Sequence, residues 1–325
     1  MYRRRAELAL LLNCVLWGAT FVLVKSALEL ISPVLFLALR FSIATLALVT
    51  IFAWRRVYGS PGADPLVRGR PPCRPAIEVP AFSRVGRSGP GGLAPTWGSA
   101  LPGCMIGVFL FLGYLFQTLG LRTTTPPKSA FLTGLATVMV PLLAMLVYRI
   151  KPRIFELAGV LAATLGMGLM TLNGPIGSIS RGDLLTIGGA IAFSAHIVAT
   201  GHFAEQIGYE VLSLMQIGTA AVCALLLFSR VESPRIVWQP MVVVTILVTA
   251  LLCTALAFTI QAWAQHYTTA TRTALIYAVE PVVAWITSYL LAGEGLSARG
   301  AAGAGLILAG VLLVEVKPVQ VKSHL

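Results

Sequence analysis

The sequence predicts an all-α integral membrane protein in which ten transmembrane helices form two inverted five-helix repeats. Three observations support this prediction. Of the 325 residues, 57% are hydrophobic and 11% are charged, and the mean hydropathy is +0.85. The apolar residues gather in ten long stretches, and the two halves of the chain resemble each other. This composition excludes a water-soluble globular fold and is typical of a chain that crosses a membrane many times.

The ten apolar stretches have the length of membrane-spanning helices. About 20 residues in a helix cross a hydrocarbon core of roughly 30 Å, and backbone groups cannot stay unpaired in lipid, so each span is expected to be helical. A β-barrel requires alternating segments of about 10 residues, which this sequence lacks. The expected spans cover 6–27, 33–54, 101–121, 127–148, 155–173, 183–202, 211–229, 240–264, 272–292 and 299–316.

An internal repeat relates the two halves of the chain. Residues 120–172 match residues 264–316 at a constant offset of 144. Further upstream the best offset is 176, which places Glu7 on Asp183 and Arg40 on Gln216. Five spans per copy is an odd number, so the second copy is expected to lie inverted in the bilayer, as in many secondary transporters.

The change of offset predicts an insertion between spans two and three. We expect spans one and two of the first repeat in 1–56, the insertion in 57–98, and spans three to five in 99–173. The second repeat is expected in 182–316, followed by a cytoplasmic tail in 317–325. The insertion contains eight prolines together with many glycines and arginines, a composition that favours disorder. An artefact of the sequence is the alternative.

The charge distribution predicts the topology. The net charge is +12. With a cytoplasmic N-terminus, the inner segments hold 16 Lys and Arg and the outer segments hold six. The positive-inside rule therefore favours an orientation with both termini in the cytoplasm, and we expect the protein in the cell membrane. Because the positive charge is explained by this topology, we expect no nucleic-acid partner. Five cysteines, four of them within spans, imply neither a disulfide framework nor a metal site.

Charged residues at membrane depth are the strongest candidates for a functional site, because such charges are costly and normally face the bundle interior. Glu280 lies about 13 Å into span nine and precedes Pro281, which bends a helix and frees a backbone carbonyl. Arg40 lies in the outer half of span two, where it is suited to bind an anionic group. The alternative for Glu280 is a permanent polar partner that holds the kink.

Further polar and aromatic residues complete the predicted substrate site. His196, central in span six, either exchanges protons or bonds a neighbouring helix. Gln117 and Gln261 are equivalent in the two copies and either line a pathway or join helices. Trp17 and Tyr277 offer aromatic surface for the apolar part of a solute.

Two further features lie at the edge of the predicted site or away from it. Lys25 is a peripheral candidate that attracts anionic solutes, or else reaches the headgroups and pairs with Glu29. Spans five and ten are rich in glycine and are expected to pack closely or to form an oligomer interface.

Several motifs resemble the drug/metabolite transporter superfamily, of the EamA-domain type. They include Trp17-Gly18-Ala19-Thr20-Phe21 in span one, the segment from Ser32 to Phe41 that opens span two, and Lys128-Ser129-Ala130-Phe131 at the start of span four, with Glu280-Pro281 in the second copy. The resemblance covers nearly everything outside 57–98 and implies two inverted repeats around a central cavity, alternating access, and small organic substrates such as amino acids or other metabolites. The long loop after span two departs from the family pattern.

We therefore expect a secondary transporter of small organic metabolites or drugs that exports its substrate. Glu280 and His196 suggest proton coupling, whereas facilitated diffusion needs neither residue. An intramembrane enzyme, a channel, and a receptor or scaffold are the alternatives; the sequence lacks His-Glu-x-x-His and Gly-x-Ser-x-Gly motifs. The expected partners are a small-molecule substrate and the lipid bilayer, with no cofactor or metal, and the chain is expected to be a monomer or a homodimer.

Overall fold

The computed structural model describes residues 2–58, 97–123, 126–149, 152–171, 180–292 and 297–316. Most of the predicted insertion 57–98 and the tail 317–325 lie outside these ranges. Across the described residues the regular elements are helices, and the β pairing there is an isolated bridge between Ile31 and Ile236. The predicted all-α class is confirmed.

The first half of the chain forms six helices: α1 (Tyr2–Ala27), α2 (Pro33–Tyr58), α3 (Trp97–Gly120), α4 (Pro126–Gly134), α5 (Ala136–Tyr148) and α6 (Ile154–Thr171). The second half begins with α7 (Arg181–Phe203) and α8 (Tyr209–Val231). It continues with α9 (Pro240–Ala250), the π-helix η1 (Leu251–Leu256), α10 (Ala257–Ala264), α11 (Ala270–Tyr277), α12 (Glu280–Ala292) and α13 (Ala298–Val316).

Seven helical stretches of the described residues are long and apolar enough to cross a membrane: 2–27, 33–58, 100–120, 129–148, 181–203, 209–231 and 240–265. Two shorter apolar helices cover Ile154–Met170 and Ala298–Val314. The chain is therefore a multi-pass membrane protein. Large apolar side chains such as Leu101 and Leu146 are exposed on the bundle, as expected for surfaces that contact lipid.

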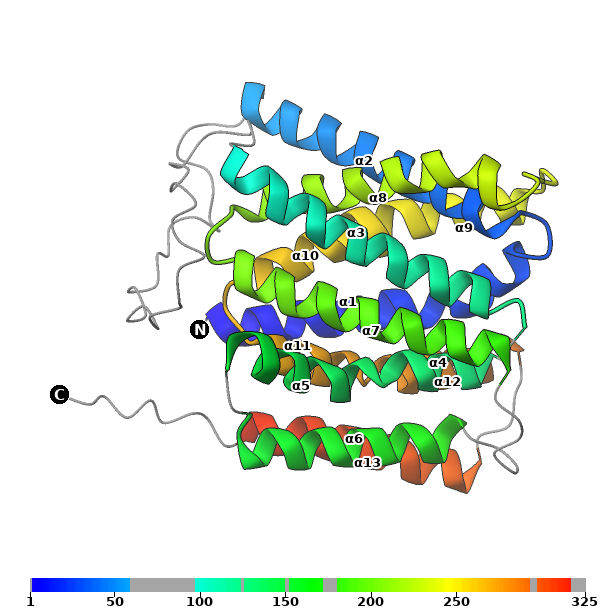
Figure 1. Ribbon diagram of the computed structural model, residues 1–325. Coiled ribbons are helices and arrows are strands. Elements are labelled where there is room, and N and C mark those ends of the chain that lie inside the picture. The colour runs from blue at the N-terminus through cyan, green and yellow to red at the C-terminus, as the bar shows by residue number, and fades with distance from the viewer. Residues whose placement is uncertain are drawn as a thin grey trace.

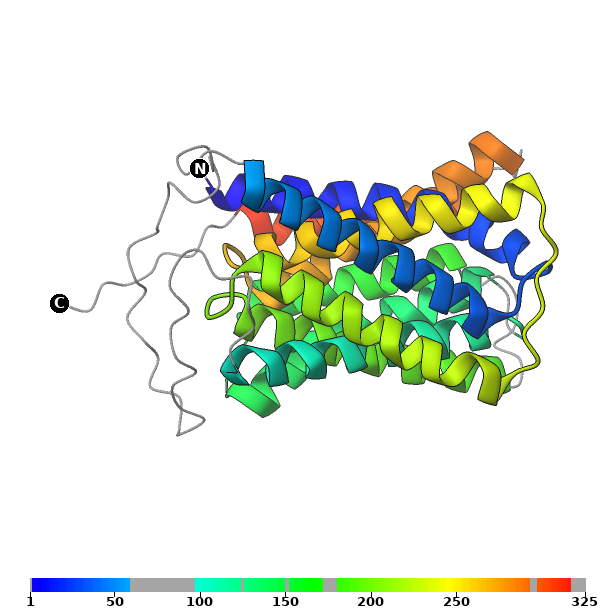
Figure 2. The ribbon, with the colours of Figure 1, turned by 90° about the horizontal axis from the view of Figure 1, so that it is seen from above.

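The helices run side by side in one bundle (Figures 1 and 2). In Figure 1, α2, α8 and α9 occupy one edge, α1, α7 and α11 lie in the middle, and α6 with α13 forms the opposite edge. The start of α1 and the end of α13 lie at the same end of the bundle.

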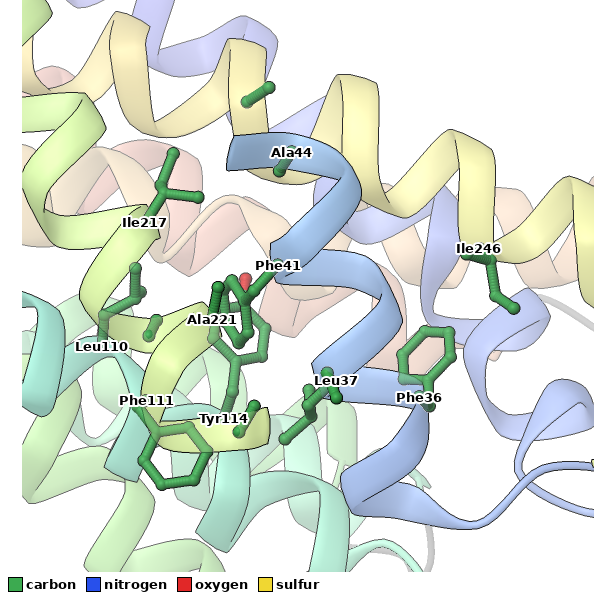
Figure 3. Packing of buried hydrophobic residues seen from close by; sticks show 14 of the residues in the cluster. Phe36, Leu37, Phe41, Ala44, Leu110, Phe111, Tyr114, Ile217, Ala221 and Ile246 are labelled. Atoms are coloured by element: carbon green, nitrogen blue, oxygen red, sulfur yellow. The ribbon is translucent and has the colours of Figure 1, made fainter. Parts of the chain in front are cut away.

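The largest apolar cluster joins α2 to α3, α8 and α9 (Figure 3). Phe36 and Phe41 of α2 are fully buried there; Phe36 lies on the side of Ile246 of α9, and the Phe41 ring contacts that of Tyr114 of α3. Large apolar side chains on successive turns of α2 fill the space between these helices at close packing. This cluster fixes α2, and with it Arg40, against η1 and α3.

Glycines allow α6 and α13 to pack almost backbone to backbone. A Cβ added at Gly166 would lie 2.5 Å from the Gly303 carbonyl oxygen, and one added at Gly303 would lie 2.5 Å from that of Gly166. Gly159 and Gly310 make the same reciprocal approach at 2.7 and 2.6 Å. The predicted close packing of spans five and ten is thus found between these two helices of one chain.

Two predicted spans are each divided into two helices. The expected span 127–148 breaks at Leu135, between α4 and α5, and the expected span 272–292 breaks at 278–279, between α11 and α12. The second break lies just before Glu280 and Pro281, where the sequence predicted a kink. The first break was not predicted, because no proline lies at Leu135.

Candidate functional site

A cavity lies between α1, α2, α3, α4, α5, α7, α10, α11 and α12, and it encloses about 1140 Å³ of empty space including its mouth. From α1 it is lined by Trp17, Thr20 and Val24, and from α3 by Tyr114, Gln117 and Thr118. These residues belong to the second halves of both helices. The cavity therefore lies toward the end of the bundle where α1 and α3 finish, which we call the open end.

All seven residues of the predicted substrate site line this cavity, namely Trp17, Arg40, Gln117, His196, Gln261, Tyr277 and Glu280. They come from seven different helices and are brought together only by the packing of the bundle. Lys25 does not line the cavity; its side chain is exposed near the end of α1 and forms no ion pair with Glu29 in the described part of the chain.

Arg40 is held in the cavity wall by neutral acceptors. Its Nε donates to Thr254 Oγ1 at 2.6 Å, and its Nη2 donates to the Tyr114 hydroxyl at 3.1 Å and to the Cys253 carbonyl at 3.3 Å. The guanidinium carbon also lies 4.4 Å from the centroid of the Tyr114 ring. The side chain is buried, and these contacts fix its orientation while leaving its positive charge uncompensated.

The π-helix η1 supplies the acceptors for Arg40. The Thr254 hydroxyl donates to the Thr249 carbonyl five residues earlier at 2.8 Å. The Cys253 carbonyl also accepts from Trp17 Nε1 at 2.8 Å, so one carbonyl orients both Trp17 and Arg40. A π-helical turn inside a longer helix often marks a functional site, because its wider turn displaces side chains and carbonyls from regular helical positions.

Aromatic rings form a continuous wall around the cavity. The Trp17 ring lies 4.9 Å from that of Tyr277 and 5.4 Å from that of Phe258, measured between centroids. Tyr114 makes edge contacts with Phe193 at 5.2 Å and with Phe258 at 6.1 Å. Such edge-to-face pairs hold the rings rigidly, so the wall presents a preformed apolar surface.

Glu280 is the first residue of α12 and faces the cavity at the break from α11. Its carboxylate makes no hydrogen bond and no ion pair within the described residues. The backbone around it is tightly packed, since a Cβ added at Gly18 of α1 would lie 2.9 Å from the Glu280 carbonyl oxygen. The rigid backbone therefore presents an unpaired carboxylate to the cavity.

The remaining predicted residues also make contacts with neighbouring groups. His196 Nε2 lies 2.8 Å from Oε1 of Gln216 on α8, an interhelical contact. Gln117 Nε2 donates to Thr133 Oγ1 at 3.2 Å and so joins α3 to α4. Gln261 donates to Gln265 at 2.9 Å within one stretch of helix. These side chains are wall residues whose positions are fixed by hydrogen bonds.

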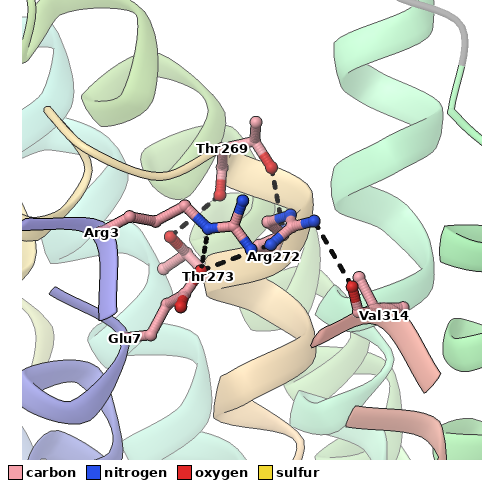
Figure 4. A network of polar contacts seen from close by, with 6 residues as sticks. All are labelled: Arg3, Glu7, Thr269, Arg272, Thr273 and Val314. Atoms are coloured by element: carbon pink, nitrogen blue, oxygen red, sulfur yellow. Dashed lines mark hydrogen bonds and ion pairs between the residues drawn. The ribbon is translucent and has the colours of Figure 1, made fainter. Parts of the chain in front are cut away.

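A polar network occupies the other end of the bundle, where α1 begins (Figure 4). Glu7 Oε1 accepts from Arg3 Nε at 2.8 Å and from Nη1 of the buried Arg272 at 3.4 Å. Arg272 Nη2 donates to the Val314 carbonyl at 3.4 Å, which ties α1, α11 and α13 together. Tyr2 stacks on Tyr267 at 5.7 Å nearby. We call this end the closed end.

Sequence reasoning missed several residues that shape the site. Asn13 Nδ2 donates to the Ala257 carbonyl at 2.9 Å and to the hydroxyl of the cavity residue Tyr277 at 3.2 Å. Asn13 could have been predicted from the sequence, because it is a polar residue in an apolar span and lies one helical turn before Trp17. Thr254 and the Cys253 carbonyl gave no signal, because no residue pattern marks a π-helix within an apolar run.

The chain is similar to known transporters over nearly its whole length. Residues 4–67, 81–172 and 180–316 match the sequence model of the EamA-like transporter family. A protein of Archaeoglobus fulgidus described as an uncharacterized transporter is 29% identical over 315 residues, which cover 97% of this chain and 87% of that protein. A solved crystal structure of a protein aligns with a TM-score of 0.71 and 18% identity over 96% of this chain and 97% of its own, which shows a shared fold.

Proposed function

Because this chain belongs to the EamA-like transporter family, we propose that it is a secondary transporter that carries small organic metabolites or drugs across the cell membrane by alternating access. The observation that carries the proposal is the cavity lined by charged and aromatic side chains, which lies toward the open end while a polar network joins the helices at the closed end. Alternating access requires a central site that is accessible from one side at a time.

We propose ten spans arranged as two inverted repeats. The offset of 144 carries the starts of α4, α5 and α6 onto those of α11, α12 and α13. The offset of 176 carries the end of α1 and the start of α2 onto the end of α7 and the start of α8. Both divided spans break at equivalent positions. The reciprocal glycine contacts between α6 and α13 have the form that a two-fold relation between the repeats requires.

The proposed topology places both termini in the cytoplasm, which makes the closed end cytoplasmic. The excess of Lys and Arg in the inner segments supports this orientation. Export is the direction that we propose. The transporting unit is a monomer or homodimer and uses neither a cofactor nor nucleic acid.

The seven residues that line the cavity are the proposed substrate site. Arg40 provides the positive charge, Glu280 provides the negative charge or binds a proton, and Trp17 and Tyr277 provide apolar surface. Proton coupling through Glu280 is part of the proposal, since its carboxylate has no partner in the described chain and faces the cavity.

Counterflow in proteoliposomes tests the proposal. The purified protein is first screened for metabolites and drugs that raise its melting temperature, because a ligand of the folded state stabilises it. Each compound found is then loaded unlabelled into proteoliposomes, and uptake of the labelled compound is followed. Saturable, transient accumulation is expected for a carrier. If no stabilising compound shows counterflow, the transport proposal is wrong and a receptor or scaffold role gains support.

A further inference from the structure

Two opposite charges face the same cavity without pairing with each other. Arg40 and Glu280 both line it, yet the described ion pairs use Glu7 and Glu210 as their acidic partners. A charge taken out of water is costly unless it gains a partner of opposite sign. Both charges are therefore placed to be neutralised by something that enters the cavity.

The contacts of Arg40 leave its charge available to a ligand. Thr254, Tyr114 and the Cys253 carbonyl are neutral acceptors, and they use Nε and Nη2. Nη1 has no acceptor within the described residues. A guanidinium held rigidly in this way is preorganised for an anionic group, because little side-chain freedom remains to be lost on binding.

An aromatic surface connects the two charged positions. Trp17 shares the Cys253 carbonyl with Arg40, and its ring makes an edge contact with Tyr277. Tyr277 lies three residues before Glu280, across the break between α11 and α12. A solute that reaches from Arg40 to Glu280 therefore lies along rings that shield it from water.

From these contacts we infer that the substrate is a zwitterion with an apolar group: its anionic group binds Arg40, its cationic group binds Glu280, and its apolar part contacts Trp17 and Tyr277. This inference rests on the proposed function and names the substrate class of that site. A solute with one charge leaves the other protein charge without a partner, whereas a zwitterion satisfies both.

A set of probes that share one apolar group and differ only in charge tests the inference on the unmodified protein. Phenylalanine is the zwitterion, phenylalanine amide and phenylethylamine are the cations, and phenylpropionate is the anion. The same forms built on the leucine and tryptophan side chains vary the apolar part. The shift of melting temperature with concentration gives each affinity. We expect the zwitterion of at least one series to bind roughly tenfold or more tightly than its singly charged forms.

Two substitutions assign each end of the solute. Glu280→Gln is expected to reduce the advantage of the zwitterion over the anion, and Arg40→Gln its advantage over the cations. Glu29→Gln and Arg122→Gln are the matched controls, because both residues are exposed near the open end and outside the cavity wall. Arg40→Lys keeps the charge if Arg40→Gln fails to fold, and it is expected to keep the preference for zwitterions.

The outcomes separate this inference from the transport proposal. If a singly charged or neutral compound binds and shows counterflow while no zwitterion does, the substrate class is wrong and the carrier remains. If zwitterions bind but none shows counterflow, the binding site stands and transport is wrong. If no zwitterion stabilises the protein, or if neither cavity variant changes the ranking of charge forms, the inference is overturned.

Discussion

Replacing Glu7 by glutamine tests whether the polar network at the closed end acts as a gate. The substitution keeps a hydrogen-bond acceptor for Arg3 and removes the negative charge beside Arg272. The side chains of Glu7 and Arg272 are only 9% and 5% exposed, whereas that of Arg3 is 36% exposed. In alternating access α1 must separate from α11 and α13 at this end, so the network stabilises the state described here relative to the opposite one.

The size of the effect follows from this burial. Losing one partner of a fully buried ion pair costs about 3–5 kcal/mol. Because Arg3 is partly exposed, we expect about 2 kcal/mol for Glu7→Gln, discounted for solvent. That energy corresponds to a roughly 30-fold shift of the equilibrium toward the state that is open at this end.

Cys14 is a native reporter for the opening of the closed end. It is fully buried between α1 and α11, with Sγ 3.3 Å from the Ile276 carbonyl oxygen. In a protein that retains Cys14 and has its other four cysteines replaced by alanine, the rate of modification by a water-soluble thiol reagent measures how often this contact opens. Glu7→Gln is expected to raise that rate about 30-fold, measured well below the melting temperature of each variant.

Glu210→Gln is the matched control for this experiment. Glu210 pairs with Arg55 at 3.1 Å at the same end of the bundle, but both side chains are substantially exposed and the pair joins α2 to α8. Its loss is expected to leave the rate for Cys14 unchanged within about twofold. An unchanged rate in Glu7→Gln, or an equal increase in both variants, would refute the gate.

Three further predictions concern packing, capping and coupling. Gly166→Ala places a methyl group against the backbone of α13 and is expected to lower the free energy of unfolding by about 1–3 kcal/mol. Gly305→Ala is the control with no expected loss, because nothing lies within 4 Å of a Cβ added there. Equal melting temperatures of the two variants would contradict the close packing of α6 and α13. Glu232→Ala removes the carboxylate oxygen that accepts from two backbone N–H groups at the start of α2, each at 2.9 Å, and is expected to cost about 1–2 kcal/mol, checked by thermal unfolding against the wild type. Glu280→Gln is expected to abolish acceleration of transport by a pH gradient in proteoliposomes; a variant with normal transport and unchanged pH dependence excludes this residue as the proton carrier.

The sequence predicts which residues lie inside the bundle, but only part of how they contact one another. The described part of the chain is helical where the apolar runs predicted helices, and seven of its helical stretches are long enough to cross a membrane, because an apolar run in lipid must satisfy its own backbone in a helix. Arg40 and Glu280 were predicted as site residues because charged side chains at membrane depth normally face the interior of the bundle. The break at Leu135 and the π-helix at Leu251–Leu256 were not foreseen, since both depend on packing against neighbouring helices.

The sequence by itself determined the helical class, the many membrane crossings and the residues that belong inside the bundle, because these follow from the local balance between apolar length and the cost of bare polar groups in lipid. Tertiary structure decided which of those residues meet. Arg40 and Trp17 share one carbonyl of η1, Glu280 has no partner among the described residues, and Lys25 lies outside the cavity. Such relations depend on how distant helices pack, which no local pattern specifies.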